Sequence, residues 1–223
     1  MNAFSDPQAV ARYVDGPPRM VPGYVALQRM AMLLLAERAA DDSRILVLGA
    51  GGGLEMKVLA EAHPKWRIDG VDPSAAMLDL ARQTLGPSAK SVVLHEGLID
   101  VAPLGPYDGA TCILTLHFLA RQERLRTLRE LHGRLRPGAP LVVAHFSFPQ
   151  EPDERNLWLS RYAAFAVASG MEPVQMAKAR AGISESLPIL SPREDEELLC
   201  AAGFSDVTMF YMGFTFRGWV AYA

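Results

Sequence analysis

The feature that most limits the possible folds of this chain is an alternation of short apolar segments with helical patterns between residues 44 and 145. The apolar segments are continuous, and proline or glycine interrupts the helical stretches between them. Continuous apolar strands joined by helices are typical of a parallel sheet that helices cover on both faces. The predicted strands lie at residues 44–48, 66–71, 90–95, 107–114 and 141–145, and the predicted helices at 54–62, 74–85 and 121–135.

Different patterns flank this core. A helix is predicted at residues 24–40, after a polar, proline-interrupted arm. Beyond residue 145 two helical patterns follow one another without a strand, at 154–169 and 172–186, and they are interpreted as an inserted cap. A last helix at 192–202 precedes two apolar strands at 206–212 and 214–221, separated only by the tight link Met212-Gly213, which predicts an antiparallel hairpin.

The strongest single motif is a glycine-rich loop after the first predicted strand. Residues 45–53 read Ile-Leu-Val-Leu-Gly-Ala-Gly-Gly-Gly, and a helical pattern begins directly after them. Glycines at such a junction permit a sharp turn and let a ligand approach main-chain N–H groups. A dinucleotide-binding loop would place its third glycine where this chain has Leu54, so a nicotinamide oxidoreductase is a disfavoured alternative. A plain tight turn is the other alternative.

An acid follows the second predicted strand. Asp72 lies 19 residues after Gly53, where a carboxylate can accept the ribose hydroxyls of an adenosine. The alternative is that Asp72 caps the next helix, because Asp before Pro-Ser suits a helix start. The order of glycine loop and acid favours the ribose role. Asp69, inside the strand, and Asp100, late in the loop after the third strand, suit it less.

The spacing Gly49, Gly51, Gly53 and the segment from Gly70 to Arg82 resemble motifs I and II of the S-adenosylmethionine-dependent methyltransferases. The resemblance implies an α/β fold with a Rossmann-like seven-stranded sheet, mostly parallel and ending in the antiparallel hairpin, and S-adenosylmethionine as cofactor. It implies one domain, with an arm and helix (1–40), a cofactor-binding core (41–145), a helical cap (146–190) and a C-terminal helix and hairpin (191–223). The implied cofactor contacts are Tyr24, Gly49, Ala50, Gly51, Gly53, Asp72, Pro73, Met77, Gly97, Leu98 and Leu114.

One position departs from that family. Motif I usually has an acid two residues before its first glycine, and this chain has Val47 there. The acid often helps to hold the methionyl ammonium of the cofactor. Another group must therefore do this work here.

Four stretches outside the core motifs are similar to the carboxy-S-adenosylmethionine synthase group of this class, which serves tRNA wobble-uridine modification. They are residues 19–24, 114–119, 145–148 and 202–204. This closer resemblance implies that Tyr24 closes over the methionyl end of the cofactor.

The same group uses an asparagine on the fourth strand, where this chain has Ile113, and an arginine in the cap to hold the extra carboxylate. Lys178 and Arg180 are the nearest basic residues, but neither is in register with that arginine. We therefore predict methyl transfer to a small-molecule acceptor, with carboxy-S-adenosylmethionine synthesis as the alternative. A cofactor-binding regulator without chemistry is a further alternative.

Methyl transfer needs a base only when the acceptor must lose a proton. His117, just after the fourth predicted strand, is the candidate base, and a structural histidine is an equal interpretation. His145, at the end of the fifth strand, ranks lower. Tyr162, Tyr211 and Phe214 are candidates for a substrate pocket, although aromatic core is the commoner role of such residues.

The composition limits the classes of partner and the compartment that we expect for this protein. The net charge of −3 disfavours a dedicated nucleic-acid binder, and the arginines between residues 121 and 136 are interpreted as a solvated helix face. Cys112 and Cys200 have no metal-ligand spacing, so we expect no metal and two buried thiols in a reducing cytosol. Residues 1–7 lack the pattern of a signal peptide, and no apolar run could span a bilayer, so we expect a cytoplasmic protein, with a homodimer as one possible state.

Overall fold

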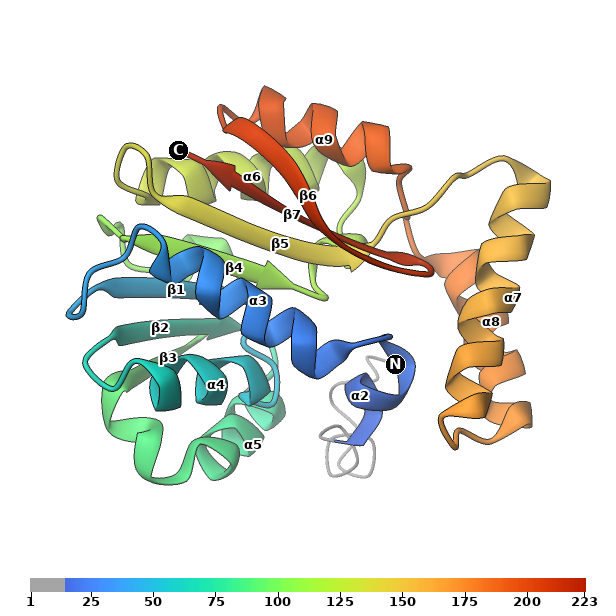
Figure 1. Cartoon of the computed structure of the whole chain (residues 1–223), viewed down its shortest axis with the longest axis horizontal. Helices are drawn as coiled ribbons and strands as arrows, with labels where there is room; N and C mark the ends of the chain where they lie inside the picture. The colour runs from blue at the N-terminus through green and yellow to red at the C-terminus, as the bar shows by residue number, and fades with distance from the viewer. Residues whose placement is uncertain (1–14) are drawn as a thin grey trace.

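The computed structural model describes residues 15–223, so the expectations about a signal peptide and about the first part of the arm lie outside the described residues. Seven strands form one sheet in the order β3-β2-β1-β4-β5-β7-β6 (Figure 1). Strands β1 to β5 are parallel, and β7 runs antiparallel between β5 and β6. The strands are β1 (Arg44–Leu48), β2 (Arg67–Asp72), β3 (Val92–Glu96), β4 (Gly109–Ile113), β5 (Pro140–Phe146), β6 (Ser205–Gly213) and β7 (Phe216–Tyr222). The predicted sheet and hairpin are confirmed.

Helices cover both faces of the sheet. One face packs against α3 (Tyr24–Ala36), α4 (Leu54–Ala62) and α5 (Ala75–Leu85), and the other against α6 (Arg121–Arg134) and α9 (Pro192–Ala201). Along β1 the side chains alternate between the two apolar clusters: Ile45 and Val47 belong to the first, and Leu46 and Leu48 to the second. Burial on both faces explains why these strands are continuously apolar in the sequence.

The cap consists of two helices, α7 (Pro152–Ala168) and α8 (Pro173–Ser186), which pack on each other. Figure 1 shows them beyond the carboxyl end of β5. The short helix α2 (Gly16–Met20) contacts α7, where the Tyr162 hydroxyl donates to the sulfur of Met20 over 3.4 Å. The arm and the cap therefore meet at the edge of the sheet where ligands of open α/β folds bind.

Several element boundaries differ from the predictions, and three of the differences have a clear structural cause. Helix α3 ends at Ala36 instead of residue 40, because the N–H groups of both Arg38 and Ala39 bond to the carbonyl of Leu35 and tighten the last turn. Strand β4 begins two residues late, because Tyr107 bridges to Leu135 outside the sheet. The hairpin turns at residues 214–215 instead of at Met212-Gly213, and Gly213 still pairs with Phe216.

One of the two cysteines is exposed, contrary to the prediction that both are buried. Cys112 is buried as predicted, but Cys200 is exposed, because it lies on the outer side of α9.

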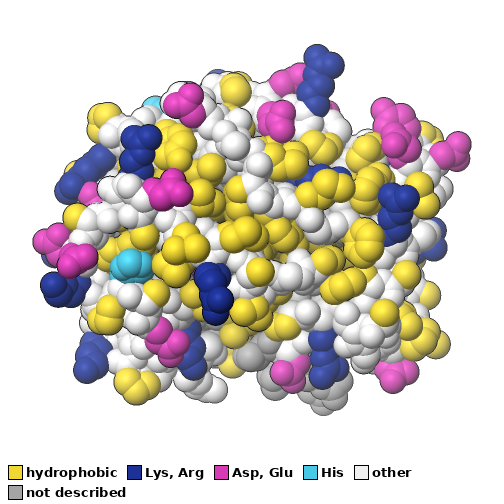
Figure 2. All heavy atoms as spheres, viewed as in Figure 1, with side chains coloured by type: hydrophobic (Ala, Val, Ile, Leu, Met, Phe, Trp, Pro, Cys, Tyr) yellow, Lys and Arg dark blue, Asp and Glu magenta, His cyan; other side chains and the backbone are white. Residues whose placement is uncertain are grey.

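Figure 2 shows hydrophobic side chains gathered over the middle of one face, where Figure 1 places α3. Val25 and Leu33 of that helix are exposed. The homodimer stays a prediction. No helix within residues 15–223 is long and apolar enough to cross a membrane.

Candidate cofactor site

The glycine loop joins β1 to α4 and is fixed to the neighbouring strand. The N–H groups of Gly49 and Ala50 donate to the carbonyl of Val71 in β2 over 2.8 and 2.9 Å. Gly49 has a φ of +80°, and a Cβ there would overlap the side chain of Thr115. Only glycine fits this position, because the turn is left-handed and the neighbouring loop lies against it.

Gly53 has a different reason to be glycine. Its φ is +83°, and a Cβ on it would come within 2.9 Å of the Ala81 Cα on α5. It does not line either of the cavities described below. Gly53 thus lies at the close contact between α4 and α5, and the structure does not place it at the cavities where a cofactor contact was predicted.

Asp72 connects the glycine loop to the start of α5. One carboxylate oxygen accepts from the N–H of Gly51 and the other from the N–H of Ser74, both at 2.9 Å. The N-cap itself is Ser74, whose hydroxyl accepts from the N–H of Met77 over 3.3 Å, so the alternative role of Asp72 as helix cap is wrong. Burial raises the pKa of Asp72, while its two backbone hydrogen bonds oppose the rise.

A cavity of about 930 Å³ opens at the carboxyl ends of β1, β2 and β4. Its size is that of a pocket for a cofactor or drug-sized ligand. It brings together eight of the predicted cofactor residues, namely Gly49, Gly51, Asp72, Pro73, Met77, Gly97, Leu98 and Leu114. Ser186 and Leu187 from the cap, and Glu123 and Thr127 from α6, close its other side. Sequence reasoning missed these four, because they come from segments distant in the chain.

The lining of this cavity is mostly apolar. Leu98 and Phe118 remain 50% and 46% exposed although both are large hydrophobic residues. Among the described residues that line it, Asp72 and Glu123 carry charge and no lysine or arginine is present. Glu123 is paired with Arg126 at 2.6 Å, and this guanidinium also bonds Asp100. The cavity therefore favours a ligand that is apolar in part and carries no net negative charge.

A narrow second cavity of about 20 Å³ adjoins the first, and the two share Gly49, Ile113 and Leu114. Tyr24 and Ala50 line it, so the structure brings these predicted residues to the glycine loop. The Tyr24 hydroxyl accepts from the side-chain amide of Gln28 over 2.7 Å.

Glu55 also lines the narrow cavity and was missed by sequence reasoning. Its side chain is buried, with 8% of the residue exposed, and Oε1 has no hydrogen-bond partner. Burial raises its pKa to about 7, and the Thr111 hydroxyl works in the opposite direction. The available signal was its spacing, because Glu55 and Leu59 lie one turn apart on the apolar side of α4.

Leu114, which lines both cavities, has a φ of +57°. Its N–H donates to the carbonyl of Ala144 in β5 over 2.6 Å. A left-handed conformation at a residue with a Cβ is unfavourable, and such strain concentrates at ligand sites. The end of β4 is thus held in an unusual shape where the two cavities meet.

His117 is not brought to either cavity. It is 4% exposed, and its ring contacts the rings of Phe118 and Phe146 at centroid distances of 4.3 and 5.0 Å. Burial lowers its pKa well below the ordinary value, and the nearby His145 lowers it further, so the imidazole is neutral. His145 is also buried, with Nε2 3.2 Å from a carboxylate oxygen of Asp195. Neither histidine faces the ligand space.

The aromatic candidates are absent from both cavity linings. Tyr162 is buried beside Phe146 and Phe216, and the hydroxyl of Tyr211 donates to the carbonyl of Pro22 over 2.5 Å. Phe214 is 42% exposed on the hairpin turn. These side chains pack the arm, the cap and the hairpin together.

The arginines of α6 are not all solvated, contrary to the prediction. Arg124 is fully buried under α9, 2.5 Å from Asp195, and also donates to the carbonyl of Pro188 over 3.0 Å. Arg134 is 5% exposed and bonds the side chain of Glu130. A helix packed on top of α6 buried a face that the charge pattern alone assigned to solvent.

The strand order, the glycine loop after β1 and the acid after β2 define the fold of the S-adenosylmethionine-dependent methyltransferases. Residues 46–141 match the family model of the methyltransferase domain, so this part of the chain is similar to that family. The solved structures agree on the fold. Human N-acetylserotonin methyltransferase has a TM-score of 0.68 at 17% identity, over 98% of this chain and 57% of that one. A methyltransferase from Aquifex aeolicus has a TM-score of 0.65 at 17% identity, over 97% of this chain and 98% of that one.

Curated relatives cover nearly the whole chain. The carboxy-S-adenosyl-L-methionine synthase of Pseudomonas fluorescens is 29% identical over 98% of this chain and 92% of that protein. The enzyme of the same name from Chromohalobacter salexigens is 28% identical over 99% of this chain and 83% of that protein. The similarity therefore includes the arm, cap and hairpin as well as the matched domain.

Proposed function

We propose that this protein binds S-adenosylmethionine and transfers its methyl group to a small acceptor without negative charge. The observation that best supports this proposal is the main cavity, which joins the glycine loop and Asp72 to an apolar lining in which none of the described residues is a lysine or arginine. A sulfonium cofactor carries positive charge at the reacting centre. A cavity whose described lining has acidic groups and no lysine or arginine suits it.

The residues fit this cofactor. The remaining acceptor positions of Asp72 suit the ribose hydroxyls, while Gly97 and Leu98 offer a backbone and an apolar surface for the adenine. When bound, the cofactor supplies an electrophilic methyl group. The protein orients the acceptor and excludes water, and the cap residue Leu187 and the loop residue Phe118 line the cavity for this purpose.

His117 has no place in this proposal as a base, because its buried ring lies outside the cavity lining. The acceptor then reacts through a free electron pair, without a histidine to remove its proton. The catalytic role of His117 stays a prediction, and the burial of its side chain argues against that role.

Carboxy-S-adenosylmethionine synthesis is the second candidate. The curated relatives of that name, similar over 98% and 99% of this chain, support it better than they support methyl transfer. The cavity lining weighs in the other direction, since a carboxylate on the ligand would lack a cationic partner among the described lining residues.

Titration calorimetry with S-adenosylmethionine, S-adenosylhomocysteine, carboxy-S-adenosylmethionine and NAD tests both candidates. We expect binding of the first two and weaker binding of the carboxylated form. Preference for the carboxylated form would establish the second candidate in place of methyl transfer. Binding of NAD alone would overturn the assignment of the glycine loop. A thermal-shift assay gives an independent check, because a ligand at a hundred times its dissociation constant adds about 2.7 kcal/mol of stability.

A further inference from the structure

At the position where motif I usually has an acid, this chain has the apolar residue Val47. Val47 is fully buried in β1 and pairs with Gly70 of β2 and Thr111 of β4. Its side chain belongs to the apolar cluster on the face that α3 and α4 cover. A carboxylate that does the work of this acid must therefore come from another element on the same face.

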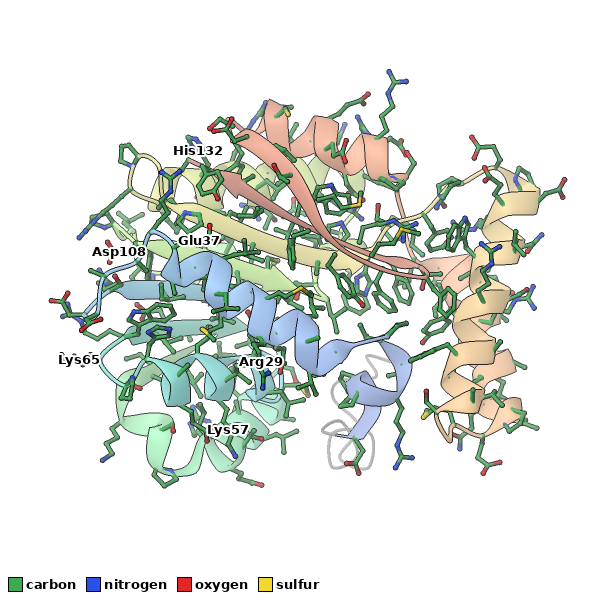
Figure 3. The ribbon with its side chains drawn as sticks, viewed as in Figure 1. Arg29, Glu37, Lys57, Lys65, Asp108 and His132 are labelled. Carbon is green, nitrogen blue, oxygen red and sulfur yellow. The ribbon has the colours of Figure 1, made fainter. Side chains whose placement is uncertain are left out.

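Glu55 reaches this place from α4. It lies in the first turn of the helix that follows the glycine loop, and its carboxyl faces the hydroxyl of Thr111, the strand partner of Val47. The carboxyl has no cationic partner among the described residues. The nearest lysine on the helix, Lys57, points away from the sheet in Figure 3 and pairs with Glu61 at 4.0 Å.

A buried carboxyl group without a partner is unfavourable for the ligand-free fold. Oε1 of Glu55 is shielded from water and accepts no hydrogen bond. The narrow cavity beside it has a volume of about 20 Å³. A single water needs roughly 10–15 Å³. An ammonium group is of similar size, so the space beside Glu55 can hold one.

The narrow cavity also lies where the amino-acid end of the cofactor would be expected. It shares Gly49, Ile113 and Leu114 with the main cavity, in which the adenosine part would lie. Tyr24, the residue that the family resemblance puts at the methionyl end, lines the narrow cavity together with Glu55. The amino-acid end of the cofactor would therefore meet Glu55, whose Oε1 has no hydrogen-bond partner among the described residues.

We propose that Glu55 binds the ammonium group of the methionyl part of S-adenosylmethionine, from α4, in place of the acid that Val47 does not supply. This inference rests on the proposed binding of that cofactor. The ammonium donates to the unpaired oxygen of Glu55, and the buried charge gains a cation that the described residues do not provide.

Titration calorimetry with two ligands and three proteins tests this role. S-adenosylhomocysteine carries the ammonium group, and 5′-methylthioadenosine lacks the whole amino-acid part. The proteins are the wild type, Glu55→Gln and the matched control Glu61→Gln, which makes the same chemical change at an exposed site of the same helix. We expect Glu55→Gln to weaken S-adenosylhomocysteine about 10- to 100-fold and to leave methylthioadenosine unchanged, since a hydrogen bond to a charged group is lost. Glu61→Gln should change neither.

Equal binding of S-adenosylhomocysteine by Glu55→Gln and the wild type would overturn the role of Glu55 and leave the proposed function standing. A wild type that binds neither ligand would instead remove the proposed function. The deaminated analogue of S-adenosylhomocysteine provides a test that needs no variant: the wild type should bind it about 10- to 100-fold more weakly than the parent ligand. Equal affinity for the two would contradict the inference.

Discussion

Replacing Glu55 by glutamine should stabilise the ligand-free protein at pH 8 and leave its stability nearly unchanged at pH 5. Burial raises the pKa of Glu55 from its ordinary value of 4.5 to about 7 in the folded protein. The folded state therefore binds this proton more tightly than the unfolded state does. Consequently the free energy of unfolding falls as the pH rises from 4.5 through 7, and the glutamine variant lacks this loss.

The difference between a pKa of 4.5 and one of about 7 sets the magnitude. At 1.36 kcal/mol per pKa unit it corresponds to roughly 3 kcal/mol of unfolding free energy. Cys112 adds no pH dependence in this range, because burial and the Glu55 charge raise the pKa of its thiol and keep it protonated.

Urea denaturation between pH 5 and pH 8 measures this effect. The comparison is the free energy of unfolding of Glu55→Gln minus that of the wild type, with the exposed-site variant Glu61→Gln as control. The difference should grow with pH for Glu55→Gln and stay constant for Glu61→Gln. A constant difference for Glu55→Gln would refute the reasoning, because Glu55 would then titrate as it does in the unfolded chain.

Three further outcomes are expected. Gly53→Ala should cost about 1–3 kcal/mol in urea denaturation, because its left-handed φ of +83° and the Ala81 Cα at 2.9 Å leave no room; an unchanged midpoint would contradict that close contact. Asp72→Asn should weaken S-adenosylhomocysteine at least about tenfold in calorimetry, and unchanged affinity would contradict its ribose role. Cys200 should react with a thiol reagent in the folded protein, whereas Cys112, buried and held protonated, should react only after unfolding; equal rates would contradict this assignment.

Local patterns in the sequence predicted most of the fold. Strands such as Arg44–Leu48 are identified by their own continuous apolar residues, and helices by their period and their end signals. The order of glycine loop, acid and hairpin then led to the fold class, and the resemblance to a known family implied eight residues of the main cavity. These features are determined locally, because backbone geometry and burial on both faces leave a signal within a few residues.

The tertiary structure alone decided which charged and polar groups are buried. Arg124 is covered by α9 and is paired there with Asp195, which lies 71 residues further along the chain. The ring of His117 lies between aromatic residues and away from the cavity. Glu55 faces Thr111, more than 50 residues away, and Oε1 of its buried carboxyl has no hydrogen-bond partner among the described residues. Burial depends on what packs on top of a residue, and that information lies in distant parts of the chain.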